Sequence, residues 1–84
     1  MTLDVLYFAW LRERIGLPRE RVDTTAATVR ELVAQLAAMD DWHAAAFADM
    51  AAVRVAVDQQ LVDGLDAPLA GAREVAFFPP MTGG

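Results

Sequence analysis

The two most apolar strand-like segments of this 84-residue chain lie near its opposite ends. One runs from Leu3 to Ala9 and the other from Glu74 to Phe78, and both are rich in branched and aromatic residues. Such residues are typical of β-strands, and a strand that is apolar throughout is typical of the buried centre of a sheet. We therefore expect the first and last strands to lie side by side in the middle of one sheet.

A single long helix is predicted between these strands. Thr28 and Glu31 have the spacing of a capping box, in which the two side chains satisfy backbone N–H groups at the start of a helix. The pair Asp40-Asp41 is expected to end this helix and to begin a shorter one that reaches Phe47. The apolar stripe of the long helix repeats at three and four residues and consists of Val29, Leu32, Val33, Leu36 and Met39.

Three weaker segments are predicted to complete the sheet. Arg21 to Asp23 is a short strand, and Val53 to Asp58 alternates between apolar and polar residues. A turn at Asp58-Gln59 or at Gln59-Gln60 leads into a short strand at Leu61-Val62. The predicted fold class is therefore α+β, a mixed sheet of about four or five strands with one main helix and one short helix.

Length, composition and charge restrict the class of protein. A chain of 84 residues forms one domain that buries roughly 60–65% of its unfolded surface. There is no cysteine, so neither a disulfide nor a thiolate metal site is expected. A net charge of −5 argues against nucleic acid and favours partners with basic surfaces.

The location of the protein is predicted from two further features. The longest uncharged apolar run, Val5 to Leu11, is too short to span a bilayer, so no membrane association is expected. The N-terminus lacks a basic start followed by an apolar stretch and a cleavage site. We therefore expect a cytoplasmic protein.

Side-chain alternation predicts a second apolar face on the sheet. If the charged residues Asp4 and Glu74 point away from the helix, their alternate neighbours do the same. At 56% apolar residues the chain has more hydrophobic material than a small core needs, and this face is too apolar for solvent. It is a predicted partner interface, unless the parity is reversed and its residues form the core. The face consists of Leu6, Phe8, Ala56, Ala76 and Phe78, together with Leu61.

The side chains supply no catalytic constellation, and no bound cofactor or metal is expected. His43 is the only histidine, has no cysteine to share a metal with, and is predicted to lie on a helix surface. No glycine-rich loop ends in a lysine, so ATP is not bound through a P-loop. Helix caps are predicted at Asp40, Asp41 and Asp49, and turn residues without the spacing of a calcium loop at Asp58, Asp63 and Asp66.

The segment from Arg12 to Arg19 contains Gly16 and Pro18 and is predicted to be a turn. Its charged run, Arg12-Glu13-Arg14, is interpreted as a solvated loop that pairs with itself. Packing roles are predicted for Trp10, Trp42 and Phe47.

The most unusual group is the carboxylate at Gly84, which follows Pro79-Pro80 and Gly83. Prolines end sheet pairing and favour a stiff, extended arm, while glycines have no side chain to obstruct a narrow channel. We expect a domain at residues 1–78 and a tail at residues 79–84. A carboxylate becomes an acyl donor only as a mixed anhydride, and no motif of the chain binds ATP, so activation requires another protein. The alternative is a frayed terminus or a cloning remnant.

The end of the chain resembles the signature of the MoaD family, the small subunits of molybdopterin synthase. The matching run is Phe77-Phe78-Pro79-Pro80-Met81-Thr82-Gly83-Gly84. Further matches are Phe8-Ala9 followed by Arg12-Glu13, Thr28-Val29, Val55 to Gln59, Pro68-Leu69 and Glu74 to Ala76. Two departures affect local turns: Asp58 stands where asparagine is common, and Gly71-Ala72-Arg73 replaces an acidic turn.

The resemblance implies a ubiquitin-like β-grasp fold and a sulfur-carrier function. In such a protein an ATP-dependent, MoeB-like activating enzyme adenylates Gly84, which is then converted to a thiocarboxylate. The tail enters a MoaE-like large subunit, in a heterotetramer, and delivers sulfur to a cyclic pyranopterin monophosphate. The implied reactive residues are Gly83 and Gly84. The implied partner-binding residues are Leu61, Phe78, Pro79, Pro80, Met81 and Thr82, to which the apolar outer face adds Phe8.

Three other functions stay open on the sequence alone. A related carrier for another pathway, such as thiamine synthesis, also ends in Gly-Gly but generally lacks the Phe-Phe-Pro-Pro approach. A ubiquitin-like modifier would join Gly84 to lysines of other proteins. A plain interaction module would have an inert tail.

Overall fold

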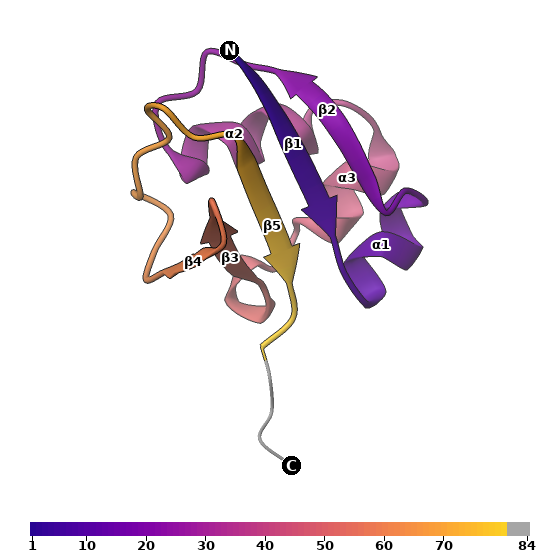
Figure 1. Cartoon of the computed structure of the whole chain (residues 1–84). Helices are drawn as coiled ribbons and strands as arrows, with labels where there is room; N and C mark the ends of the chain where they lie inside the picture. Colours follow the sequence, from indigo (N-terminus) through magenta and orange to yellow (C-terminus); the bar gives the residue numbers. More distant parts are fainter. Residues whose placement is uncertain (81–84) are drawn as a thin grey trace.

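The computed structural model describes residues 1–80, and the predictions made for Met81, Thr82, Gly83 and Gly84 lie outside the described residues. The described elements follow one another along the chain as in Figure 1. They are β1 (Thr2–Tyr7), α1 (Trp10–Ile15), β2 (Arg19–Asp23), α2 (Val29–Ala37), α3 (Asp41–Ala46), the 3₁₀ turn η1 (Met50–Ala52), β3 (Arg54–Val57), β4 (Gln60–Val62) and β5 (Glu74–Phe78).

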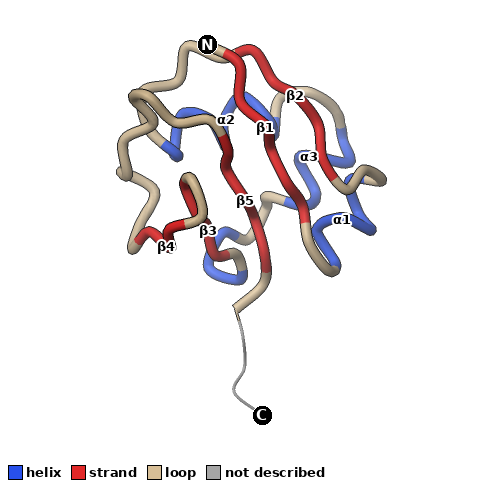
Figure 2. Tube along the Cα trace, viewed as in Figure 1, coloured by secondary structure: helices blue, strands red, loops and turns tan. Residues whose placement is uncertain are grey.

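Within residues 1–80 the strands form one mixed sheet in the order β2-β1-β5-β3-β4 (Figures 1 and 2). Only β1 and β5 run parallel; their register pairs Val5 with Val75 and Tyr7 with Phe77. The other neighbouring strands are antiparallel. The prediction that the first and last strands lie side by side at the centre is confirmed, and so is the α+β class.

Helices α2 and α3 cover one face of this sheet (Figure 1). The predicted capping box starts α2: Thr28 Oγ1 accepts the N–H of Glu31 at 3.3 Å, and Glu31 Oε2 accepts the N–H of Thr28 at 3.3 Å. The predicted stripe is buried from Val29 to Leu36. Met39 was wrongly placed in it, because α2 ends at Ala37 and Met39 is 49% exposed.

The alternation of β1 and β5 separates the core from the outer face as predicted. The side chains that face the helices are almost fully buried, and they are Leu3, Val5, Tyr7, Val75 and Phe77. Leu69, in the long loop before β5, is also fully buried. The opposite parity, with Leu6 and Phe8 in the core, is excluded by this burial pattern.

The prediction of a turn from Arg12 to Arg19 is wrong, because this stretch begins inside helix α1. Leu11 and Ile15 are one turn apart and both buried, so the helix packs one apolar edge. It ends at Gly16, whose φ of 88° is left-handed and whose N–H donates to the carbonyl of Arg12 at 2.8 Å. The charged residues of α1 are exposed on the helix surface rather than in a loop.

The aspartates act as predicted at two helix starts and one turn. The Asp40 carboxylate caps α3, and the Asp49 carboxylate accepts the N–H of Ala51 in η1 at 3.2 Å. The β3–β4 turn lies at Asp58-Gln59, where both residues have positive φ, 49° and 69°. No helix within residues 1–80 has the length and apolar character that a bilayer crossing requires.

Candidate partner-binding face and tail

A row of small and aliphatic side chains crosses the sheet face opposite α2 and α3. The strand registers align Leu6 with Ala76, Ala76 with Ala56, and Ala56 with Leu61. Because residues directly opposite each other share a face, these four side chains form one apolar row across β1, β5, β3 and β4. Leu61 at the sheet edge is 64% exposed, whereas Ala76 in the central strand is shielded by its neighbours.

Two aromatic side chains lie next to the apolar row, where the chain leaves the sheet. The N–H of Phe8 donates to the carbonyl of Phe77 at 3.1 Å and extends the β1–β5 ladder by one residue. Phe78 is the last residue of β5 and lies in register with Arg54 of β3. Phe8 is 45% exposed and Phe78 is half-buried, so both rings are available on the outer face.

An open apolar groove lies between these aromatic residues. Its lining consists of Phe8, Ala9, Ala76, Phe78 and Pro79. Pro79 directly follows β5, so the groove begins where the tail does. A continuous apolar surface of this kind, bordered by polar groups, is typical of a site that receives an apolar side chain of a partner protein.

Charged side chains border the outer face at the opposite end of the strands. Asp4 and Glu74 lie in register on β1 and β5. Asp4 accepts a hydrogen bond from Arg21 Nε at 3.1 Å and lies 3.5 Å from a terminal nitrogen of Arg19. Exposed pairs of this kind add only about 0–1 kcal/mol each to stability. They do confine the apolar surface to the end of the sheet from which the tail departs.

The structure thus brings together some of the predicted site residues and separates others. Phe8, Phe78 and Pro79 line the groove, while Leu61 lies at the far end of the apolar row. Pro80 follows half-buried, and the remaining tail residues lie outside the described part of the chain. The roles assigned to all of these residues stay predictions.

A polar cluster around the buried side chain of His43 was not foreseen. The prediction that His43 lies on a helix surface is wrong, because its side chain faces the sheet edge and only 3% of the residue is exposed. Its Nδ1 lies 2.8 Å from Asp40 Oδ1 and its Nε2 lies 2.7 Å from Glu20 Oε2. Tyr7 donates its hydroxyl to the same Glu20 oxygen at 2.7 Å. A histidine three residues after an N-cap aspartate was the one local signal of this arrangement.

The cluster shifts the pKa values of its members. Burial by itself lowers the pKa of His43, but hydrogen bonds to Glu20 and Asp40 outweigh it and raise the pKa above its ordinary value. The pKa of Asp40 is lowered, chiefly because its carboxylate accepts the backbone N–H of His43. The pKa of Tyr7 is raised by burial and by the adjacent Glu20.

The packing roles predicted for three aromatic residues are confirmed for two of them and wrong for Trp42. Trp42 is 68% exposed, so its predicted packing role is wrong, whereas Phe47 is buried as predicted. Trp10 packs in part against the core, and the Arg14 guanidinium lies 4.8 Å from its ring centre.

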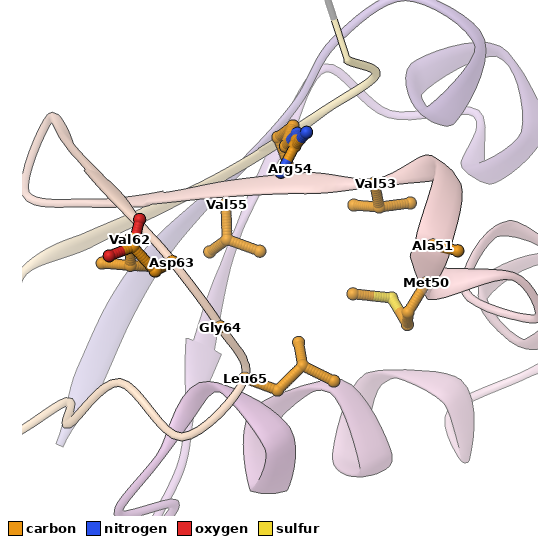
Figure 3. A pocket seen from close by; sticks show the side chains of 9 residues that line it. All are labelled: Met50, Ala51, Val53, Arg54, Val55, Val62, Asp63, Gly64 and Leu65. Carbon is orange, nitrogen blue, oxygen red and sulfur yellow. The ribbon is translucent and has the colours of Figure 1, made fainter.

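A second hollow lies on the helix side of the sheet, between β3, η1 and the loop after β4 (Figure 3). In Figure 3 the side chains of Met50, Val53, Val55 and Leu65 point into it, whereas Arg54 points to the other side of β3. The walls are mainly aliphatic, and Asp63 lies at the border. Within residues 1–80 no cluster of histidine, aspartate or glutamate residues is arranged to hold a metal ion. The surface that this hollow offers is mainly apolar.

A mixed sheet wrapped on one side by helices, with a last central strand that leads into a proline-rich tail, defines a ubiquitin-like β-grasp domain. The sequence model of the ThiS family matches residues 5–84, and the chain belongs to this family. The resemblance to the small subunits of molybdopterin synthase is confirmed by two relatives named molybdopterin synthase sulfur carrier subunit, which are 43% and 39% identical to this chain. The ThiS match does not by itself distinguish the pathways that such proteins serve.

The chain is also similar to individual proteins. The chain is 43% identical over 82 residues to the molybdopterin synthase sulfur carrier subunit of Escherichia coli (strain K12), covering 98% of this chain and 99% of that protein. It is 26% identical to SAMP1 from Haloferax volcanii, with a TM-score of 0.75 over 100% of both chains. A chain in the complex of subunits 1 and 2 of the molybdopterin-converting factor from Helicobacter pylori 26695 is 23% identical, with a TM-score of 0.64 over 100% of both chains. The last likeness shows the fold alone.

Proposed function

We propose that this chain is the sulfur-carrier subunit of a molybdopterin synthase. The observation that carries the proposal is the apolar groove at Phe8, Phe78 and Pro79, an open surface next to the start of the tail that a partner protein could contact. The Escherichia coli relative, which is 43% identical, supports the assignment to molybdopterin synthesis.

The proposed chemistry begins at the carboxylate of Gly84. Within a MoeB-like activating enzyme, a carboxylate oxygen attacks the α-phosphorus of ATP, pyrophosphate leaves and an acyl adenylate forms. Hydrosulfide then attacks the acyl carbon and AMP leaves, which gives the thiocarboxylate and releases a proton. No side chain of the described residues takes part in these steps. The chain supplies the acyl group and the surface by which the enzyme holds it.

Delivery of the sulfur follows in a MoaE-like large subunit. The thiocarboxylate sulfur attacks a carbon of the cyclic pyranopterin monophosphate and displaces an oxygen substituent from it, which gives a thioester. Water then cleaves the acyl–sulfur bond, which returns the carboxylate and leaves the sulfur on the pterin as a thiolate. Two such deliveries supply the two sulfurs of the dithiolene. The complex of subunits 1 and 2 from Helicobacter pylori supports pairing of a protein with this fold with a larger subunit. We propose that this chain and its large subunit form a heterotetramer.

The groove and the proline pair have separate roles in this proposal. Pro79 and Pro80 have no N–H to donate, so β5 cannot continue as a strand beyond Phe78 and the tail is free to leave the sheet. The groove receives an apolar side chain of the partner, and Leu61 extends the contact to the sheet edge. The net charge of −5 favours a basic rim on the partner around this contact.

Intact-mass measurement tests the proposal. The chain is incubated with ATP, sulfide and a MoeB-like enzyme that is known to activate its own carrier, and the expected product has one oxygen exchanged for sulfur. The reaction without ATP should leave the mass unchanged. An unmodified chain in the complete reaction, under conditions where the enzyme modifies its own carrier, would contradict the proposal.

A second function, protein modification, is favoured by one observation. The Haloferax volcanii protein SAMP1, which resembles this chain, is described as a small archaeal modifier protein. Branched Gly-Gly peptides on lysines of other proteins, recovered from the native cell, would support modification. A thiocarboxylate on the isolated chain would support sulfur transfer.

A further inference from the structure

The contacts of His43 favour the protonated form of its ring. A neutral imidazole has one N–H and one lone pair, and a carboxylate can only accept. Both ring nitrogens of His43 lie 2.7–2.8 Å from carboxylate oxygens. The Asp40 oxygen concerned also accepts the backbone N–H of His43 at 2.8 Å, and the Glu20 oxygen also accepts the Tyr7 hydroxyl. Both contacts are hydrogen bonds only when the ring is an imidazolium.

This ring connects three elements of the fold. His43 and its N-cap Asp40 belong to the start of α3, Glu20 belongs to β2, and Tyr7 belongs to β1. The Tyr7 ring contacts the His43 ring edge-on, with centroids 6.1 Å apart, and stacks on Phe77 at 6.2 Å. The residues that follow Tyr7 and Phe77 in sequence line the apolar groove on the other face. The polar cluster is therefore connected, through the rings of Tyr7 and Phe77, to the two strand ends that carry the groove.

We propose that protonated His43 is a pH-sensitive clamp that ties α3 to the β1–β2 edge and supports the aromatic layer behind the groove. When the ring loses its proton, one of the two part-buried contacts becomes a lone pair facing a carboxylate, which is repulsive. The clamp then loosens at the junction of α3 with the sheet. The inference concerns the fold and does not depend on the proposed sulfur chemistry.

The charges around the ring define the direction of the pH dependence. The groups that face it are Glu20 from β2, Asp40 from the start of α3 and the neutral Tyr7 hydroxyl from β1. The pKa of His43 in the folded chain is raised above its ordinary value of 6.5. The stabilisation is therefore complete below that value and is lost as the pH rises through the raised pKa. The charged residues of the neighbouring α1 are all exposed, and they are Arg12, Glu13 and Arg14.

The unmodified chain permits a direct test, because it contains a single histidine. Nitrogen-15 NMR of the full chain should show a titration midpoint above that of an ordinary histidine, with both ring nitrogens protonated below that midpoint. Ring-proton shifts of Tyr7 and Phe77 should follow the same midpoint, while the methyl-proton shifts of the distant Leu69 should not. A midpoint at or below the ordinary value would overturn the proposal.

Two variants add a matched comparison. Glu20→Gln retains an oxygen acceptor for the Tyr7 hydroxyl but removes the charge beside His43, so the histidine midpoint should move down. The denaturant midpoint should then begin to fall at a lower pH than in the unsubstituted chain. Asp41→Asn removes an exposed charge from the first turn of α3. It should change neither the histidine titration midpoint nor the pH at which the denaturant midpoint begins to fall. The clamp would be contradicted if the histidine titration midpoint of Glu20→Gln equalled that of the unsubstituted chain. It would also be contradicted if Glu20→Gln and Asp41→Asn shifted that midpoint by the same amount.

Discussion

Tyr7 and Phe77 lie in register on the parallel strands β1 and β5, and their rings stack with centroids 6.2 Å apart. On each strand the next residue, Phe8 or Phe78, points to the opposite face and lines the groove. A register slip of one residue would exchange the core pair with the surface pair. The pairing that builds the core therefore also fixes the position of the groove beside the tail.

Phe78→Ala and Phe77→Ala are adjacent substitutions with opposite expected effects. Phe78→Ala removes a half-buried ring of the groove, so binding to the large subunit should weaken by about ten- to a hundredfold with little change in stability. Phe77→Ala empties a fully buried site and should lower the free energy of unfolding by about 3–5 kcal/mol. Calorimetry of binding and denaturant unfolding separate the two. Unchanged affinity with lowered stability for Phe78→Ala would remove Phe78 from the interface.

Leu61→Arg tests how far the interface extends along the apolar row. Leu61 is 64% exposed on the edge strand β4, so an arginine fits without disturbing the core. It introduces a desolvated charge beside a partner surface that we expect to be basic, and affinity should fall by about tenfold or more. The melting temperature should be unchanged. Undiminished binding would restrict the interface to the groove and the tail.

Gln59→Gly is expected to stabilise the β3–β4 hairpin. Gln59 has a φ of 69°, which is a left-handed conformation that strains a residue with a Cβ and suits glycine. The free energy recovered by removing this strain exceeds, by a small margin, the conformational entropy cost of ordering a glycine. The free energy of unfolding should therefore rise by at most about 1 kcal/mol. Denaturant unfolding measures it. Gln60→Gly, at the first position of β4, is the control and should be destabilising.

The lowered pKa values of Asp40 and Asp58 predict a loss of folding stability in acid. The pKa of each is lowered, for Asp58 mainly because Oδ1 accepts the N–H groups of Arg73 and Glu74 at 2.9 and 3.0 Å. Their contribution is present above the ordinary value of 3.8 and is lost as the pH falls through the lowered pKa. Together with His43, they place the greatest stability in the mildly acidic range. Asp58→Asn keeps an oxygen acceptor and should flatten the acid limb; an unchanged acid limb would exclude Asp58 as a cause.

Features that depend on short sequence spacing were predictable. The capping box at Thr28 and Glu31, the alternation of β1 and β5, and the turn after Val57 all follow from residues within a few positions of one another. The prediction of the apolar helix stripe was wrong only at Met39, where the apolar repeat continues in the sequence but the helix has already ended.

Features that depend on distant partners were not predictable. His43 looks like a helix-surface residue until β2 brings Glu20, which is 23 positions away, within 2.7 Å of its ring. Helix α1 was not predicted, because its six residues are too few to show a helical repeat of apolar residues and because Gly16 and Pro18 follow closely. The apolar outer face was predicted, but the groove on it was not. The shape of the groove depends on how the chain leaves the sheet at Ala9 and Pro79.

The central claim, that the tail carries sulfur, is tested most directly by synthesis of molybdopterin with a chain that lacks Gly84. The assay contains the activating enzyme, ATP, sulfide, the large subunit and the cyclic pyranopterin monophosphate. We predict that the shortened chain has an unchanged melting temperature, acquires no thiocarboxylate and yields no molybdopterin. Formation of molybdopterin at the rate of the full chain would contradict the account.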